Sequence, residues 1–97
     1  MRTYYSDYVQ HCMRFYARHP QPHFHTNAEL KNWNACDFVM KGFTPSEKQI
    51  VLTVFRKNDT LSDNIYESAL ELNVNQDVIW KLVSRAEKLI AKRRGLL

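Results

Sequence analysis

The chain has 97 residues, enough for one domain with a small core, and its 44% apolar and 25% charged residues exclude an intrinsically disordered protein. The longest apolar run, Ile50 to Phe55, is too short to cross a bilayer, and the start MRTYYSDYVQH lacks the apolar segment of a secretory signal. We therefore expect a cytoplasmic protein without a membrane partner, in which Cys12 and Cys36 remain reduced.

The net charge of +4 is concentrated at one end of the chain. Residues 75–97 contain six Lys or Arg against two acidic residues, whereas residues 1–74 contain eight of each and are neutral overall. Basic charge confined to one element is typical of a protein that binds an anionic partner.

We expect five helices and no strand. The first helix runs from Tyr4 to Arg18, ahead of Pro20, because its apolar residues recur at helical spacing. These residues are Tyr5, Val9, Cys12 or Met13, and Tyr16. The aromatic side chains of this segment either complete the core together with Trp33 and Phe38, or form a subunit interface.

The loop HPQPHFH leads to a second helix, because its two prolines disfavour helical backbone. Thr26 to Glu29 fits a capping box that opens this helix, and Gly42 ends it. The third helix opens at Thr44, Pro45 and Glu47, which again fit a capping box. It carries Ile50, Val51, Val54 and Phe55 on one face; this β-branched run also suits a buried strand, but the cap favours a helix.

The fourth helix is expected from Leu61 to Leu72, closed by Asn73, and the fifth from about Asn75 to Arg94. Two helices joined by so short a turn have the geometry of a helix-turn-helix, with the usual small, turn and apolar positions at Ala69, Asn73, Ile79 and Leu82. The expected fold is thus a single all-α domain, residues 1–97. It has an N-terminal helical part, 1–42, and a C-terminal trihelical helix-turn-helix part, 43–97.

A helical wheel separates two faces of the last helix. The apolar face consists of Ile79, Leu82, Val83, Ala86, Leu89 and Ile90. The opposite side carries a cationic stripe made of Lys81, Arg85, Lys88 and Lys92. The stripe is either a surface for nucleic acid or an ordinary solvated face, and cations near a helix C-terminus are favoured by the helix dipole alone.

The segment from Phe43 to Leu52, the Ala69 helix, Val74-Asn75 and the long final helix resemble the region-4 helix-turn-helix of bacterial sigma factors. They are also similar to small phage transcription regulators of the ArpU and RinA type. The chain has Ser68 where such proteins usually carry an aliphatic residue, and Asn73 where they carry glycine. The resemblance implies sequence-specific binding of double-stranded DNA by a transcriptional regulator of phage or mobile-element origin.

Under this resemblance the first turns of the last helix contact base edges and its end contacts phosphates. The base-contacting set is Asn75, Gln76, Trp80, Lys81, Ser84 and Arg85. The phosphate-contacting set is Lys88, Lys92, Arg93 and Arg94. Trp80 has a second interpretation, because a tryptophan at the border of an apolar face more often packs against a neighbouring helix or a dimer mate.

The sequence leaves the oligomeric state open, together with two alternatives to a DNA-binding regulator. A homodimer would present two recognition helices to half-sites one DNA turn apart. A protein-interaction module would dock on RNA polymerase or a sigma factor with Trp80 in the contact. A small terminase-like protein would recognise DNA for packaging.

Metal binding and catalysis find little support in the sequence. His19, His23 and His25 could form a weak site in an exposed loop whose Phe24 anchors it to the core, but no paired ligands of the Cys-x-x-Cys kind accompany them. The only glycines, Gly42 and Gly95, cannot form a phosphate-binding loop, and neither cysteine has a base placed beside it by a motif. We expect no metal, no cofactor and no enzymatic activity.

Overall fold

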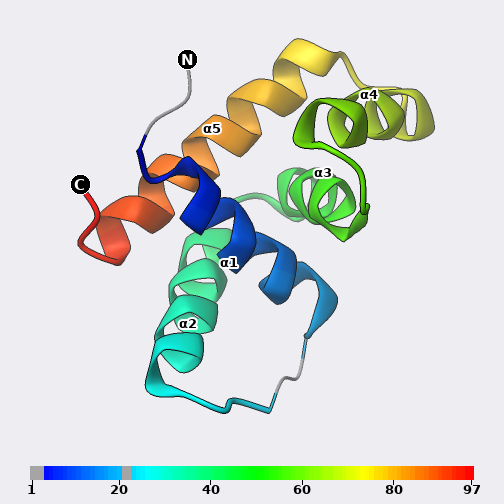
Figure 1. The fold of residues 1–97 in the computed structure, drawn as a ribbon. Coiled ribbons are helices and arrows are strands. Elements are labelled where there is room, and N and C mark those ends of the chain that lie inside the picture. The colour runs from blue at the N-terminus through cyan, green and yellow to red at the C-terminus, as the bar shows by residue number, and fades with distance from the viewer. Residues whose placement is uncertain (1–3, 21–22) are drawn as a thin grey trace.

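The computed structural model describes residues 4–20 and 23–97, and this part of the chain contains five helices and no strand (Figure 1). They are α1 (Ser6–Arg18), α2 (Asn27–Lys41), α3 (Pro45–Arg56), α4 (Leu61–Leu72) and α5 (Gln76–Arg93). The expected all-α fold is confirmed. None of the helices in the described residues has the length and apolar character needed to span a membrane.

The five helices pack around α1 and α5. α1 contacts α2, α3 and α5, while α3, α4 and α5 contact one another. α5 runs across the molecule from α4 at one end to α2 at the other, so α2 and α4 lie at opposite ends of it (Figure 1). This placement leaves one long side of α5 uncovered by other helices.

Threonine caps begin three of the helices. At α3 the capping box is complete, since the Thr44 hydroxyl accepts from the Glu47 amide and the Glu47 carboxylate accepts from the Thr44 amide. At α2 the Thr26 hydroxyl accepts from the Glu29 amide, but the Glu29 carboxylate accepts from the amide of His25 at 2.7 Å. The capping box expected at Thr26 is therefore incomplete, because the Glu29 carboxylate accepts from the amide of the preceding residue and not from that of Thr26.

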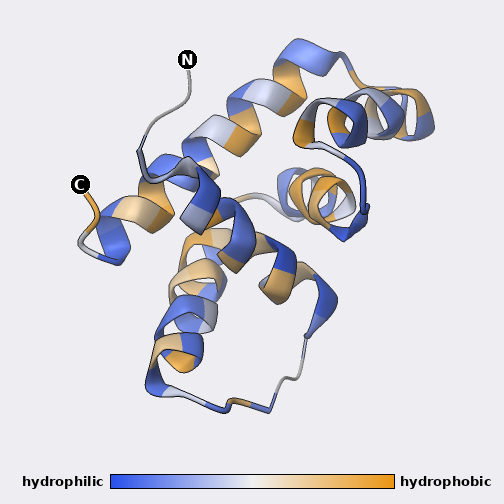
Figure 2. Cartoon of the chain, in the orientation of Figure 1, coloured by the Kyte–Doolittle hydropathy of each residue, from blue (hydrophilic) through white to orange (hydrophobic). Residues whose placement is uncertain are grey.

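The core draws apolar side chains from every helix, and hydrophobic and hydrophilic stretches alternate along each ribbon as expected for helices with one buried face (Figure 2). The largest fully buried side chains include Met13, Met40, Phe55, Ile65, Ile79 and Ile90. The assignment of Phe38 to the core was wrong, because its side chain is 57% exposed. α2 instead turns Ala35, Cys36, Val39 and Met40 inward.

The connection between α4 and α5 is as short as expected. Asn73 adopts the left-handed conformation, with φ 55° and ψ 49°, and the amides of Asn73 and Val74 both donate to the carbonyl of Ala69. The Val74 side chain is half-buried against the core, and Asn75 caps α5. The sequence thus located the helix ends on both sides of this turn within one residue.

The connection between α3 and α4 depends on the buried side-chain amide of Asn64, which no sequence pattern had indicated. The side chain of Asn64 has no exposed surface. It accepts a hydrogen bond from the Asp59 amide at 3.1 Å and donates one to the Lys57 carbonyl at 3.2 Å. Both ends of this buried amide are therefore hydrogen-bonded to the backbone of the loop.

Candidate nucleic-acid interface

α5 has a packing side and a solvent side. The residues turned into the core are Ile79, Leu82, Val83, Ala86, Ile90 and Ala91. Leu89, which the wheel assigned to the same face, lies at its margin and is 38% exposed. The side chains of Lys81, Arg85, Lys88 and Lys92 lie on the exposed side. The expected division of this helix into an apolar and a cationic side is confirmed.

The acidic residues of α5 do not neutralise the exposed lysines. The Glu87 carboxylate is turned toward α1, where it accepts hydrogen bonds from Ser6 Oγ at 3.4 Å and Gln10 Nε2 at 3.0 Å. Asp77 lies in the first turn, where the positive end of the helix dipole stabilises a negative charge. Within the described part of the chain, no acidic side chain forms an ion pair with Lys81, Lys88 or Lys92.

Arg85 is less free than these lysines. Its Nη1 atom lies 3.7 Å from Glu47 Oε2, and its guanidinium lies 4.4 Å from the centre of the Phe43 ring. Both contacts hold the side chain against the start of α3. Arg85 would have to leave them to reach a base edge, so the structure gives it a packing role in addition to the predicted one.

The two arginines at the end of α5 contact α2. The Arg93 guanidinium stacks over the Phe38 ring at 3.9 Å, and Arg94 Nε donates to Asn32 Oδ1 at 2.7 Å. Arg94 is half-buried, whereas Lys92 and Arg93 are exposed. Of the four residues predicted to contact phosphate, Lys88 and Lys92 therefore have the fewest competing contacts.

The beginning of α5 presents polar groups of a different kind. Asn75 Oδ1 accepts from the Asp77 amide at 2.8 Å and so acts as the helix cap, while Gln76 is exposed. Trp80 and Ser84 border a polar groove of about 850 Å³ between α5, α1 and the start of α4. Neither Lys81 nor Arg85 lines that groove. The six predicted base-contacting residues thus lie on two adjacent sides of α5.

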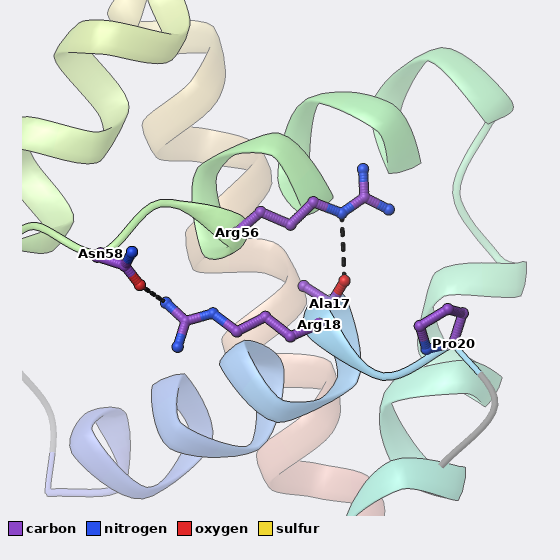
Figure 3. Close-up of a pocket in the computed structure, with 5 residues that line it drawn as sticks. All are labelled: Ala17, Arg18, Pro20, Arg56 and Asn58. Atoms are coloured by element: carbon purple, nitrogen blue, oxygen red, sulfur yellow. Dashed lines mark hydrogen bonds between the residues drawn. The ribbon is translucent and has the colours of Figure 1, made fainter.

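A second pair of cations lies where the ends of α1 and α3 meet, beside an open pocket of about 510 Å³ (Figure 3). Arg18 of α1 donates to the Lys57 carbonyl at 3.2 Å and to Asn58 Oδ1 at 2.6 Å. Arg56 of α3 donates to the Ala17 carbonyl at 3.2 Å. Each arginine supplies a donor to the end of the other helix, where carbonyl groups lack partners within their own helix.

Cys12 and Cys36 are buried free cysteines. Burial raises the pKa of the Cys12 thiol to about 11, although the charge of Arg94 opposes this, and burial raises the pKa of Cys36 further. Phe24 packs its ring on Trp33, with centroids 6.1 Å apart, but remains partly exposed. Over residues 4–20 and 23–97, no group of three or more metal-ligating side chains is close enough to hold an ion.

Comparisons of the chain with protein-family models, with curated proteins and with solved structures found no match.

Proposed function

We propose that the protein binds double-stranded DNA through the exposed side of α5 and acts as a helix-turn-helix transcription regulator of the phage or mobile-element kind. The observation that carries this proposal is the row of Lys81, Lys88 and Lys92, which is opposite the packing side and lacks acidic partners among the described residues. A row of free cations along an uncovered helix matches the spaced phosphates of a duplex.

The packing of the neighbouring helices agrees with this role. α3 and α4 both contact α5, and the left-handed Asn73 joins α4 to α5 through a turn of three residues. In a helix-turn-helix, the first helix braces the second, and the start of the second reaches base edges in the major groove. Gln76 and Lys81, both exposed in the first turns of α5, are in our proposal the main base-reading side chains.

In this proposal the contacts change along α5, from bases at its start to phosphates at its end. Asn75, Gln76, Trp80, Lys81, Ser84 and Arg85 form the proposed base-contacting set, and Lys88, Lys92, Arg93 and Arg94 the proposed phosphate-contacting set. Phosphate contacts supply affinity that does not depend on sequence, whereas a bidentate side chain on a base supplies about 1–3 kcal/mol of discrimination. Arg85 ends the first set and Lys88 begins the second.

The test is a fluorescence-anisotropy titration of a labelled random-sequence duplex at about 50 mM salt. The double variant Lys81→Ala, Lys88→Ala removes two unpaired cations from α5 and is expected to bind about 10- to 100-fold more weakly than the unaltered protein. The matched control, Lys31→Ala with Lys41→Ala, removes the same charge from α2 and is expected to bind within about threefold of it. Equal weakening in both variants would show a general charge effect and would overturn the assignment to α5.

Recognition of a particular base sequence in the DNA needs a separate test. Duplexes selected from a random pool by the unaltered protein are titrated against Gln76→Ala, which leaves the proposed phosphate contacts in place. The selected site is expected to lose about 1–3 kcal/mol of its preference over random duplex, with random-duplex affinity unchanged. A selection that yields no common sequence would contradict base readout by α5.

A second function is favoured by one observation. Trp80 is 37% exposed at the border of the groove between α1, α4 and α5, a position suited to a protein contact. In this alternative the protein docks on RNA polymerase or a sigma factor. Trp80→Ala would then abolish binding to the polymerase while leaving duplex affinity unchanged, whereas a loss of duplex affinity in a folded variant favours DNA contact by Trp80.

A further inference from the structure

The outer side of α4 is an exposed apolar ridge with acidic residues along one side of it. Tyr66 and Leu70 lie one turn apart and are 53% and 68% exposed. α4 also carries Asp63, Glu67 and Glu71, and it contains no Lys or Arg. Leu70 is the most exposed aliphatic side chain in the described part of the chain, and nothing in the packing of α4 on α3 and α5 requires it there.

The opposite end of the molecule has the complementary character. Between α2 and the end of α5 lies an apolar groove of about 360 Å³, lined by Phe38, Val39, Gly42, Leu89, Lys92 and Arg93. Phe38 and Leu89 are both exposed apolar residues. Gly42 contributes only backbone atoms to the lining of this groove.

The groove has cations and no acidic side chain in its lining. Lys92 has no ion-pair partner among the described residues, and Arg93 stacks on Phe38 without meeting a carboxylate in that part of the chain. α4 carries acidic residues instead. Glu67 has no ion-pair partner among the described residues, whereas Glu71 forms an ion pair with Lys57 at 3.1 Å. The two surfaces thus carry opposite charges beside their exposed apolar residues.

We propose that the groove between α2 and α5 receives the α4 ridge of a second copy of this chain. A helix that carries apolar residues at i and i+4 with acidic residues along one side is the shape and charge that an apolar groove with a basic rim accepts. Leu70 and Tyr66 insert between Phe38 and Leu89, and Glu67 meets Lys92.

The position of the two surfaces fixes the kind of assembly. They lie at opposite ends of α5, whose 18 residues span about 27 Å, so one chain cannot fill its own groove (Figure 1). The contact joins different patches on the two copies, and each added copy presents a new free groove and a new free ridge. Copies therefore join head to tail in an open series.

Sedimentation of nuclease-treated protein without DNA, at concentrations up to about 1 mM, tests this arrangement independently of the proposed function. The mean mass of the unaltered protein is expected to rise with concentration past twice the 11.6 kDa of the chain. Phe38→Asp blocks the groove and Leu70→Lys blocks the ridge, and each variant alone is expected to stay at the monomer mass. Both positions are exposed, and circular dichroism checks that each variant is folded.

The decisive sample is the equimolar mixture of these two variants. One intact groove and one intact ridge remain in it, so the mixture is expected to form a 1:1 pair and nothing larger. Leu30→Asp, two turns earlier on α2 and outside the groove, is the matched control and is expected to associate like the unaltered protein.

Charge reversal supplies a second test that leaves the apolar residues in place. Glu67→Lys and Lys92→Glu are each expected to weaken association at least about tenfold, and the chain that carries both is expected to regain it. The proposal is overturned if the unaltered protein is monomeric at about 1 mM. It is also overturned if the mixture of Phe38→Asp and Leu70→Lys stays monomeric, or if Phe38→Asp or Leu70→Lys alone still associates.

Discussion

Asn64 shows how one polar side chain can define a loop. Its amide is fully buried yet satisfied at both ends, by the Asp59 amide and the Lys57 carbonyl. Because this amide is itself cut off from water, losing its partners would leave a buried polar group unsatisfied, which costs about 1–3 kcal/mol. The residue thus holds the end of α3 and the start of α4 in fixed register.

Asn64→Ala is therefore expected to lower the free energy of unfolding by about 2–4 kcal/mol, because it removes both hydrogen bonds and leaves a small void. Urea denaturation followed by circular dichroism measures the change. Asn34→Ala, on the exposed side of α2, is the control and is expected to change stability by less than about 0.5 kcal/mol. An equal effect of both substitutions would contradict the role given to Asn64.

The buried thiols couple stability to alkaline pH. The folded-state pKa of Cys12 is about 11, against an ordinary value of 9.0, because burial disfavours the thiolate. Below pH 9 the folded and unfolded chains both keep this proton. Between about pH 9 and 11 the unfolded chain releases a proton that the folded chain retains, so the free energy of unfolding falls as pH rises. The raised pKa values of Cys36 and Tyr16 act in the same direction.

We expect urea unfolding at about pH 10.5 to show lower stability than at pH 8. Cys12→Ala is expected to be less stable at pH 8 because of the cavity it creates, but to lose less stability on going to the higher pH. A stability that is constant over this range, or an equal loss in the variant, would show that Cys12 is not shielded as the structure indicates.

Some residue roles were not accessible from the sequence. Arg85 was expected on base edges, but Glu47 and Phe43, which hold it, are about forty positions away in the chain. Phe38 was expected to complete the core, yet it is exposed and the Arg93 guanidinium stacks on its ring. Pattern and composition give the periodicity of each helix, but the partner of a long side chain depends on how remote helices are placed.

The elements themselves were largely predictable, because their ends carry local signals. Thr44 with Pro45 and Glu47, and Asn73 with Asn75, each satisfy backbone groups within a few residues. The arginine contacts between α1 and α3 are of the other kind, since Arg18 and Arg56 act on helix ends that only tertiary packing brings near them. They join two elements whose own sequences carry no sign of the contact.

The turn between α4 and α5 can be tested by its backbone conformation. Asn73 has φ 55°, which glycine adopts without strain and which costs other residues about 1–2 kcal/mol. Asn73→Gly is expected to leave the thermal unfolding midpoint within a few degrees, and Asn73→Val to lower stability by about 1–2 kcal/mol or more. If valine is tolerated as well as glycine, the left-handed cap does not connect α4 to α5 as described.

At the scale of the whole molecule, the placement of α2 and α4 at the two ends of α5 determines what the surface can do. It leaves the cationic side of α5 open along its length and separates the acidic α4 ridge from the basic end of α5. The sequence located the net charge but not this separation, because it depends on how α1 holds the helices together. Both proposals, DNA binding and head-to-tail association, depend on that arrangement.

The two proposals make different demands and share one residue. DNA binding requires the charge of Lys81 and Lys88. Association requires the apolar Phe38 and Leu70, which are outside the proposed DNA-contacting sets, and the charge of Lys92, which is inside them. The loss of either property leaves the other measurable.

The salt dependence of duplex binding measures how many cations of α5 contact phosphate. With Lys88, Lys92, Arg93 and Arg94 on phosphates, a plot of log association constant against log salt concentration is expected to have a slope of about −4 per protomer. Replacing Lys88 and Lys92 by alanine should bring the slope to about −2, while Lys31→Ala with Lys41→Ala should leave it near −4. A slope near zero, or one that the α5 substitutions leave unchanged, would contradict the account of α5 as a DNA-binding helix.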